Sequence, residues 1–387
     1  MKTNKTALIC ISDTYLPRAR LLARQYQKHG EETVILTPDF SHKTKAPFSS
    51  DEEGIVRLRH RPYQKNLSWQ RLLGHMEFAR RAKTWLEDWK PDRIHCLIPA
   101  NSLAMEIGRY KRKHPDVCLI FDINDLWPES LPVGSWFGKT PPAWIWKHMR
   151  NGYLKDADLL ASECALFQKK IQEQTGLPAQ VMYWSAGTEE TFTAHSALED
   201  TEHLNLCYLG FVNNIIDLDT METLFQALHA RTAVRLHLIA QGQRRDEMVE
   251  RLSPYCEIID YGAVYDPEQK QSIFDACAFG INIMKPDVQA GLSMKTLDYL
   301  QGGLPVINSL EGDVHDWIEE YRCGINIDRS RLEQTAKEIA EAAQNQLEAM
   351  RKAARQVFET DLSLSAFEKS FEILWQSEQN LTKHSRK

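Results

Sequence analysis

The chain has 387 residues, 43% hydrophobic and 26% charged, a composition typical of a globular protein with room for two domains. No apolar run reaches the roughly 20 residues that a membrane-spanning helix needs, and the run at residues 7–11 is too short for a signal-peptide core. The eight cysteines are scattered without a Cys-x-x-Cys pair, so we expect neither disulfides nor structural zinc, and a reducing, cytoplasmic setting.

The net charge of −6 is unevenly distributed along the chain. Residues 1–185 contain 28 Lys and Arg against 20 Asp and Glu, a charge of +8, so the remainder carries −14. A basic half of this kind suits an anionic membrane surface or a phosphorylated acceptor. An ordinary solvated surface is the alternative. No nucleic-acid-binding motif accompanies the charge, so no nucleic-acid partner is expected.

The first half of the chain alternates strand-like apolar runs with helical patterns. Strands are predicted at residues 7–11, 33–37, 55–59, 93–98, 117–122 and 157–161. Helices are predicted at residues 15–29, 69–89 and 165–174, and a further helix after the strand at residues 93–98 is predicted to end at residue 113. Such alternation predicts right-handed crossovers and a mostly parallel sheet. An aromatic and basic stretch at residues 136–150 fits either a membrane interface or a helix packed on the sheet.

A polar stretch at residues 186–202 predicts a linker between an N-terminal domain, residues 1–185, and a C-terminal domain, residues 203–361. In the second domain strands are predicted at residues 204–209, 235–240, 257–261, 277–284, 304–308 and 324–327, and helices at residues 220–229 and 333–359. A last helix at residues 365–377, within the segment 362–380, is expected to pack back on the N-terminal domain. The tail at residues 381–387 is expected to fray.

The second domain is organised around residues 290–307, where a polar turn and a glycine lead into a helix. Ser293 is predicted to cap this helix, and Met294, Leu297 and Leu300 to form its apolar side. The free N–H groups and the dipole at a helix start favour an anion.

Two charged residues, Lys295 and Asp298, are expected on the polar side of the same helix. One suits a diphosphate and the other a ribose hydroxyl. An ordinary surface ion pair between them is the alternative.

Residues 290–307 resemble the donor-binding signature of family-four glycosyltransferases of the GT-B architecture. In that signature two acids lie eight residues apart, ahead of a Gly-Gly-x-Pro-Val-Ile strand. Here the first position is Ala290, and the second acid is Asp298 rather than a glutamate. Further segments extend the resemblance over most of the chain, and residues 122–130 are similar to members that build bacterial capsular or surface polysaccharides. The resemblance implies an α/β fold of two Rossmann-like, doubly wound parallel-sheet domains facing a central cleft.

The resemblance also implies a nucleotide-sugar donor, favouring a UDP-sugar, as co-substrate, with no cofactor and no bound metal. The binding residues that it implies are Gly210, Asn213, Asn214, Gln241, Gly262, Tyr265, Gly291, Leu292, Ser293, Lys295 and Asp298. The family's Arg and Lys after the first donor-domain strand are missing here. Lys295 and the N–H groups of Leu292 and Ser293 are therefore expected to neutralise the diphosphate. Plain turns at the asparagines and at Gln241, and a buried Tyr265, are the alternatives.

The catalytic candidates are Asp125, Glu129 and Lys295. Asp125 and Glu129 follow a predicted strand, where a carboxylate can orient or deprotonate an acceptor hydroxyl. Asp125 also suits a cap for the turn before Pro128, and Asp13 faces the same region. The family's histidine corresponds to Leu97, so His95 is expected to be an interior residue.

Together these features predict a metal-independent, retaining glycosyltransferase. It would add a sugar to a growing, lipid-linked glycan of a surface polysaccharide, in the cytoplasm or on the inner face of the cell membrane. One alternative is an inactive GT-B accessory subunit that binds nucleotide sugars, which the missing family residues favour. Another is a GT-B UDP-sugar epimerase, for which the chain offers few acids and histidines.

Overall fold

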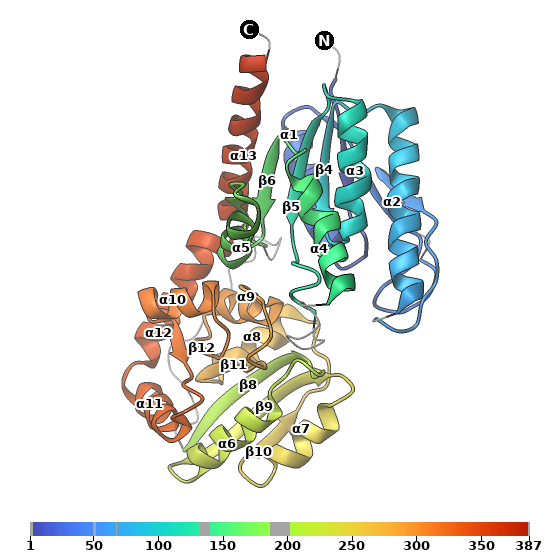
Figure 1. Ribbon diagram of the computed structural model, residues 1–387. Helices are drawn as coiled ribbons and strands as arrows, with labels where there is room; N and C mark the ends of the chain where they lie inside the picture. The colour runs from blue at the N-terminus through green and yellow to red at the C-terminus, as the bar shows by residue number, and fades with distance from the viewer. Residues whose placement is uncertain (1–2, 49–51, 67, 132–139, 186–201, 386–387) are drawn as a thin grey trace. The chain divides into compact units, whose positions relative to one another are not determined.

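The computed structural model describes residues 3–48, 52–66, 68–131, 140–185 and 202–385, which form two compact units (Figure 1). The first unit comprises Met1–Gly187 with Phe367–Lys387, and the second comprises Thr188–Ala366. The predicted linker at residues 186–202 lies outside the described residues except for its last member. Each unit contains one parallel sheet with helices, which confirms the predicted class of two Rossmann-like domains.

The sheet of the first unit has seven strands in the order β3-β2-β1-β4-β5-β6-β7, all paired in parallel. Its strands are β1 (Lys5–Ile9), β2 (Glu32–Pro38), β3 (Ile55–Leu58), β4 (Arg93–Ile98), β5 (Cys118–Ile123), β6 (Leu159–Ser162) and β7 (Gln180–Val181). The strand order reverses between β1 and β4, and ligands of doubly wound sheets bind beyond the carboxyl ends of the strands at such a point.

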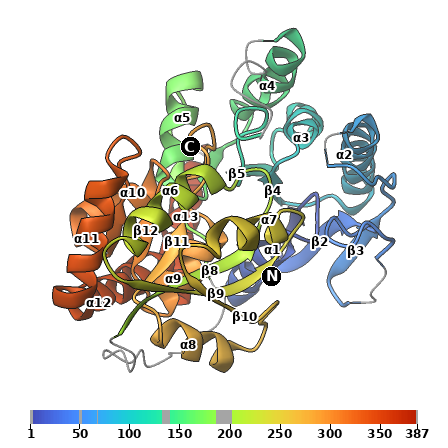
Figure 2. The same cartoon turned by 90° about the horizontal axis from the view of Figure 1, so that it is seen from below.

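Helices cover both faces of this sheet. They are α1 (Leu16–Lys28), α2 (Trp69–Trp89), α3 (Asn101–Lys113), α4 (Pro141–Leu154) and α5 (Ala165–Thr175). Figure 2 shows α2, α3 and α4 on one side of the strands and α1 on the other. The arrangement follows from right-handed crossovers, because β1 leads to β2 in one direction and β4 leads to β5 in the other.

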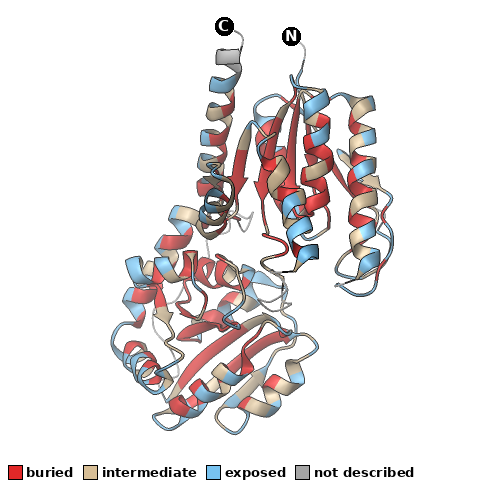
Figure 3. Ribbon diagram, viewed as in Figure 1, coloured by how far each residue is buried: buried red, intermediate tan, exposed pale blue. Residues whose placement is uncertain are grey.

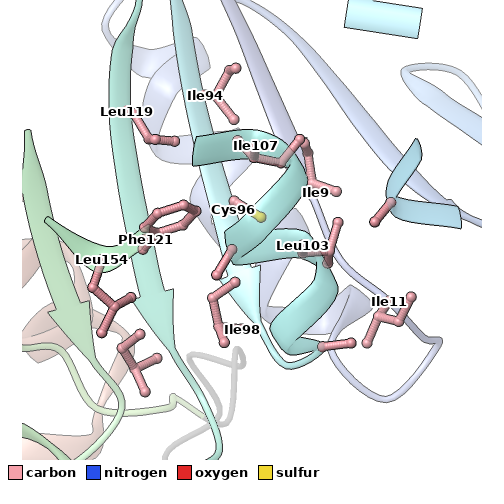
Figure 4. Close-up of a cluster of buried hydrophobic side chains, with 14 of the residues drawn as sticks. Ile9, Ile11, Ile94, Cys96, Ile98, Leu103, Ile107, Leu119, Phe121 and Leu154 are labelled. Atoms are coloured by element: carbon pink, nitrogen blue, oxygen red, sulfur yellow. The ribbon is translucent and has the colours of Figure 1, made fainter. Parts of the chain in front are cut away.

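The core of the first unit lies between α3 and the central strands (Figure 4). Leu103 and Ile107 of α3 lie over Cys96 and Ile98 of β4, and all four are fully buried. Every residue of β4 is buried, as expected for a parallel strand with both faces covered (Figure 3). Burying an aliphatic side chain such as Ile98 or Leu103 stabilises the fold by roughly 1.5–3 kcal/mol.

The chain ends with α13 (Leu364–Ser385), and its residues from 367 onward belong to the first unit. The ring of Phe371 meets that of Tyr26 edge-on at 4.8 Å, and Arg93 Nε donates to Glu378 Oε2 at 2.8 Å. The helix runs to residue 385, so the tail predicted to fray from residue 381 is largely helical.

The second unit has six parallel strands in the order β10-β9-β8-β11-β12-β13. The strands are β8 (His203–Phe211), β9 (Ala233–Gln241), β10 (Glu257–Asp260), β11 (Phe279–Asn282), β12 (Val306–Asn308) and β13 (Gly324–Asn326). Its first helices are α6 (Leu218–His229), α7 (Arg245–Leu252), α8 (Pro267–Asp275), α9 (Met294–Gln301) and α10 (Asp313–Tyr321). Three of these, α7, α8 and α10, were not predicted, because eight or nine residues give little periodicity; α9 is as short, but its cap at Ser293 indicated it.

The single helix predicted at residues 333–359 is wrong. The structure has α11 (Leu332–Asn345), α12 (Leu347–Val357) and a π-helical turn, Phe358–Leu362. Gln346 leaves helical geometry with φ −129°, and the break lets α11 pack on α6 while α12 packs on α9. None of the described helices is long and apolar enough to cross a membrane.

Candidate active site

Two buried asparagines, Asn282 and Asn308, and the partly exposed Asn326 hold the carboxyl edge of the second sheet together. Asn282 Nδ2 donates to Asn308 Oδ1, and Asn308 Nδ2 donates to Asn326 Oδ1, both at 3.0 Å. Ser293 Oγ donates to Asn282 Oδ1 at 3.1 Å and accepts from the N–H of Thr296 at 3.3 Å. Ser293 therefore caps α9 as predicted, and its bond to the asparagine ladder fixes where α9 begins.

The face that α9 turns to the sheet differs from the prediction. Leu297 and Leu300 are buried as expected, but Met294 is 54% exposed. Lys295, expected on the polar side, is only 9% exposed. The prediction was therefore wrong for Met294 and for Lys295.

Tyr299 explains the rotation of α9. Its ring packs on Gly280, where an added Cβ would lie 2.6 Å from the ring, so only glycine fits there. Its hydroxyl accepts from the N–H of Leu209 at 2.7 Å. Lys295 lies one turn before Tyr299 on the same side of the helix, so docking Tyr299 carries the lysine to the inner face.

The ammonium of Lys295 is buried and, within the described residues, has no hydrogen-bond partner. Its Nζ lies 4.3 Å from the centre of the Tyr208 ring, and a Cβ added to Gly210 would lie 3.9 Å from its Cε. Burial lowers the pKa of Lys295 to about 7. Because a buried charge without a partner is unfavourable, an anion beside this ammonium would be stabilised strongly.

Asp298 lies on a more exposed side of α9 than Lys295 does. Its Oδ1 pairs with the Nζ of Lys270 on α8. The alternative of a surface ion pair between Lys295 and Asp298 is therefore wrong.

The structure brings Gly210, near the end of β8, together with Lys295 at the start of α9. Gly210 has φ +115°, a value that favours glycine. Gly291 is buried and its carbonyl accepts from the N–H of Val314, while Leu292 and Ser293 are partly exposed.

The two asparagines after β8 differ in their contacts. Asn213 Oδ1 accepts from the N–H of Ile215 at 3.0 Å, which is the turn considered as its alternative role. Asn214 is exposed.

The remaining predicted donor residues lie on neighbouring loops. Gln241 is exposed, and its carbonyl accepts from the N–H of Val212 at 2.7 Å. Gly262 has φ +63° and donates its N–H to Asp260. Tyr265 is 85% exposed, so its expected burial was wrong; it precedes the N-cap of α8, in a loop that does not pack on the core.

In the first unit, Asp125 follows β5 and is surrounded by neutral donors. Its carboxylate accepts from the N–H of Leu126 at 2.8 Å, from Trp127 Nε1 at 2.7 Å and from the hydroxyl of Ser130. Burial raises the pKa of Asp125. No cationic side chain within the described ranges pairs with it, so Asp125 is a turn cap that also has the environment of a proton acceptor.

Glu129 is bound by two cations instead. Its Oε1 lies 3.0 Å from Arg150 Nη2 and 3.2 Å from Lys147 Nζ. Although burial opposes ionisation, the Arg150 guanidinium holds the pKa of Glu129 below its usual range. This carboxylate therefore anchors the fully buried Arg150.

Two other predicted residues of the first unit have structural contacts. Asp13 accepts from Ser41 Oγ at 2.6 Å and from the N–H of His42 at 3.0 Å. His95 lies in the interior as expected, with Nδ1 2.9 Å from the hydroxyl of Tyr26.

Sequence reasoning missed Tyr208 beneath Lys295. It also missed that Lys45, in a loop, and Arg71, in the first turn of α2, lie over the same ring of Tyr63. No local pattern links Lys45 to Arg71, because they lie 26 positions apart in the chain. Across the described ranges, no three His, Cys, Asp or Glu side chains gather as metal ligands would.

A comparison with known protein families matches part of the first unit. Residues 15–185 match the family described as Glycosyl transferase 4-like domain. This supports, over the first unit, the family expected from the sequence. No curated protein sequence matches the chain.

Solved structures of low sequence identity share the fold over nearly the whole chain. Sucrose-phosphate synthase from Thermosynechococcus elongatus is 12% identical, with a TM-score of 0.71, covering 98% of this chain and 100% of its own. Anabaena HepE in complex with UDP and glucose is 11% identical, with a TM-score of 0.65, over 97% and 100%. WaaG, a glycosyltransferase involved in lipopolysaccharide biosynthesis, is 13% identical, with a TM-score of 0.65, over 95% and 99%. These likenesses establish the two-domain fold of GT-B glycosyltransferases.

Proposed function

We propose that the protein is a glycosyltransferase that transfers a sugar from a UDP-sugar to a lipid-linked glycan of a bacterial surface polysaccharide. The observation that carries the proposal is the buried ammonium of Lys295, unpartnered among the described residues, at the start of α9 beside Gly210. The family match over residues 15–185 supports transferase activity. The UDP held by Anabaena HepE, a protein of the same fold, supports the choice of donor.

In this proposal Lys295 and the N-terminus of α9 neutralise the donor diphosphate. Glycosyl transfer leaves negative charge on the departing diphosphate, and a fixed cation in a water-poor site stabilises that charge. Asp298 accepts a hydrogen bond from a ribose hydroxyl beside its ion pair with Lys270. In the proposed donor site, the cation Lys295 thus binds the diphosphate and the anion Asp298 binds the ribose hydroxyl.

On the acceptor side we assign Asp125, rather than Glu129, to the reacting hydroxyl. The burial that raises the pKa of Asp125 makes it a better proton acceptor, whereas Arg150 holds Glu129 as an anion. Glu129 then acts by positioning the loop after β5. We propose a metal-independent reaction with retention of configuration.

We also propose a cytoplasmic location on the inner face of the cell membrane. The first 185 residues carry +8, and Trp144 and Ile145 on α4 are 65% and 55% exposed. Trp146 packs on the core. Of the two alternatives for the aromatic stretch, packing on the sheet therefore applies to Trp146, and the membrane interface is proposed for the exposed Trp144 and Ile145. Residues 136–139 of that stretch lie outside the described residues.

An inactive accessory subunit is the second candidate. It is favoured by Asn213 and Asn214, which occupy the positions where the resemblance implies an arginine and a lysine. Such a protein would bind a UDP-sugar and transfer nothing to membrane extracts. Among the described residues, no group of three or more acids, histidines or cysteines of the kind that could hold a metal supports an epimerase.

Calorimetry with UDP and uridine tests the donor site. Lys295→Met should weaken UDP binding by about 1.5–3 kcal/mol and leave uridine binding nearly unchanged, because only UDP carries the diphosphate. Lys285→Met, at an exposed lysine of the same unit, is the matched control and should change neither. Equal losses for both ligands, or wild-type protein that binds no nucleotide, would overturn the donor assignment.

Asp298→Ala gives the complementary pattern. Because both ligands contain ribose, UDP and uridine should lose similar affinity, about 1.5–3 kcal/mol. Lys270→Met removes the partner of Asp298 and should cause a much smaller loss. Unchanged affinity for both ligands in Asp298→Ala would remove Asp298 from the site.

A further inference from the structure

A cationic cluster lies in the loops at one end of the first sheet, in the segments before and at the start of α2. Its two charged members are Lys45 and Arg71, and both lie over the ring of Tyr63. The distance from the ring centre is 4.6 Å to Lys45 Nζ and 5.7 Å to Arg71 Cζ. Both also donate to Asn66, Lys45 to its Oδ1 and Arg71 to its carbonyl oxygen. Two like charges thus share one aromatic ring and one asparagine.

Within the described residues, neither cation has a carboxylate at ion-pair distance. The nearest acids are already bound by neutral donors: Asp13 by Ser41 and His42, and Asp125 by three groups of its own loop. Burial and then the charge of Arg71 lower the pKa of Lys45 to about 8, and Asp13 opposes that shift. Asp13 and Asp125 thus offset part of the positive charge, but within the described residues neither forms an ion pair with Lys45 or Arg71.

An imidazole lies beside these cations. Nδ1 of His42 is 2.5 Å from the hydroxyl of Tyr63 and 3.3 Å from Lys45 Nζ, so these contacts leave Nε2 unused. The buried Nε of Arg71 has no hydrogen-bond partner in the described part of the chain. Lys45, Arg71 and His42 are each partly exposed, so a ligand can reach them.

Trp127 connects this cluster to Asp125. The guanidinium of Arg71 lies 4.6 Å from the centre of the Trp127 ring, and the indole N–H of the same ring donates to Asp125. His75, whose buried Nδ1 lacks a partner among the described residues, stacks on that ring at 5.7 Å. A group bound by Arg71 would therefore lie close to the proposed acceptor-activating carboxylate.

Buried cations elsewhere in the same unit are paired. Arg18 binds Asp122, Arg93 binds Glu31 and Glu378, and Arg150 binds Glu129. Pairing is the usual condition for a charge removed from water. Lys45 and Arg71 differ from these three: they are partly exposed and, within the described residues, form no ion pair, so an anionic ligand can reach them from solvent.

We infer that Lys45, Arg71 and His42 form an acceptor subsite for an oxyanion, so that the acceptor is an anionic glycan carrying a phosphate or carboxylate group. The inference rests on the proposed transferase function and names the acceptor class. The planar guanidinium offers paired N–H donors to such a group, and the lysine and imidazole add single donors. An anion held there places the neighbouring sugar hydroxyl within reach of Asp125.

Titration calorimetry of the full chain with three probes tests the inference. The probes are glucose 6-phosphate, glucuronate and glucose, which share a sugar and differ in charge. The variants are the double substitution Lys45→Met with Arg71→Met, and the matched double substitution Lys43→Met with Arg80→Met at two exposed positions outside the cluster. Arg71→Lys keeps the charge and tests the guanidinium separately. Melting temperature and UDP affinity report whether each variant is folded.

We expect one or both anionic probes to bind the wild type at least ten-fold more tightly than glucose, with salt-sensitive affinity. The Lys45/Arg71 variant should lose about ten-fold or more while keeping its UDP affinity, and the Lys43/Arg80 variant should lose little. The stronger probe distinguishes phosphate from carboxylate acceptors.

Three results would overturn the inference: no preference for an anionic probe, equal binding by the Lys45/Arg71 variant, or loss of probe binding in Lys295→Met, which would place the probe in the donor site. Failure of the proposed function has a different signature: either UDP would not bind the wild type, or the wild type would bind a UDP-sugar and transfer nothing to membrane extracts.

Discussion

Among the described residues, buried cations are paired with a carboxylate in the interior of the first unit, whereas the buried cation at the start of α9 in the second unit is not. Arg18 is fully buried and makes two bonds to Asp122, with further bonds to the carbonyls of Met182 and Tyr183. Lys295 is nearly as buried, and its ammonium has no partner in the part of the chain that the structure describes. A compensated charge holds chain segments together, whereas an uncompensated one favours an anionic ligand.

The same contrast separates the two carboxylates after β5. Glu129 is bound by Arg150 and Lys147, and Asp125 only by neutral donors. We therefore expect changes at paired groups to reduce stability, and changes at unpaired groups to reduce binding or turnover. The following predictions test that division.

The largest effect is expected at Asp125. Asp125→Asn should reduce transfer of label from UDP-sugars to membrane extracts by about 10²–10⁴-fold, because a positioned base typically contributes that much. UDP affinity should stay the same. Glu129→Gln is the paired counterpart and should lower the melting temperature, since it weakens the compensation of Arg150. Equal losses of turnover in both variants, with equal melting temperatures, would break the comparison.

A large effect on stability is expected at Asp122. Asp122→Asn leaves Arg18 buried without its counter-charge, which should destabilise the first unit by about 3–5 kcal/mol. Hydrogen exchange of the β5 amides measures this within the full chain. Glu52→Gln removes the partner of the exposed Arg20 and should change stability by about 0–1 kcal/mol. A loss below about 1 kcal/mol at Asp122 would refute the structural role of that pair.

A pH effect of intermediate size is expected at Lys295. Its pKa is lowered to about 7, and bound diphosphate would raise it, so binding takes up a proton above pH 7. UDP affinity should fall up to about ten-fold per pH unit above 7, and Lys295→Met should remove this dependence. The stability of the free protein should depend on pH in the opposite direction. Between about pH 7 and pH 10 Lys295 is protonated in the unfolded chain but neutral in the folded protein, so its contribution to the free energy of unfolding rises with pH. A pH profile unchanged by Lys295→Met would contradict the assignment.

The smallest effect concerns the exposed apolar residues of α4. Vesicles containing anionic lipid should sediment the protein at low salt, and raised salt should release much of it. Trp144→Ser with Ile145→Ser should weaken the salt-resistant part by a few-fold. The control Trp146→Phe should leave it unchanged, because Trp146 packs on the core. Absence of sedimentation at low salt would refute membrane attachment.

The sequence by itself determined the alternation of strands and helices, the parallel sheets that follow from it, and the cap at Ser293. These features depend on residues a few positions apart, so hydrophobic periodicity and turn chemistry suffice to predict them. The helices α7, α8 and α10 were not predicted, because eight or nine residues give little periodicity; the equally short α9 was indicated by its cap at Ser293.

Only the tertiary structure decided which charges are compensated. The inward turn of Lys295 follows from the docking of Tyr299 on Gly280, and the pairing of Asp298 with Lys270 depends on a neighbouring helix. The grouping of Lys45 with Arg71 depends on a loop meeting the first turn of α2 over Tyr63. Burial and charge pairing are set by segments distant in the chain, so no local pattern carries them.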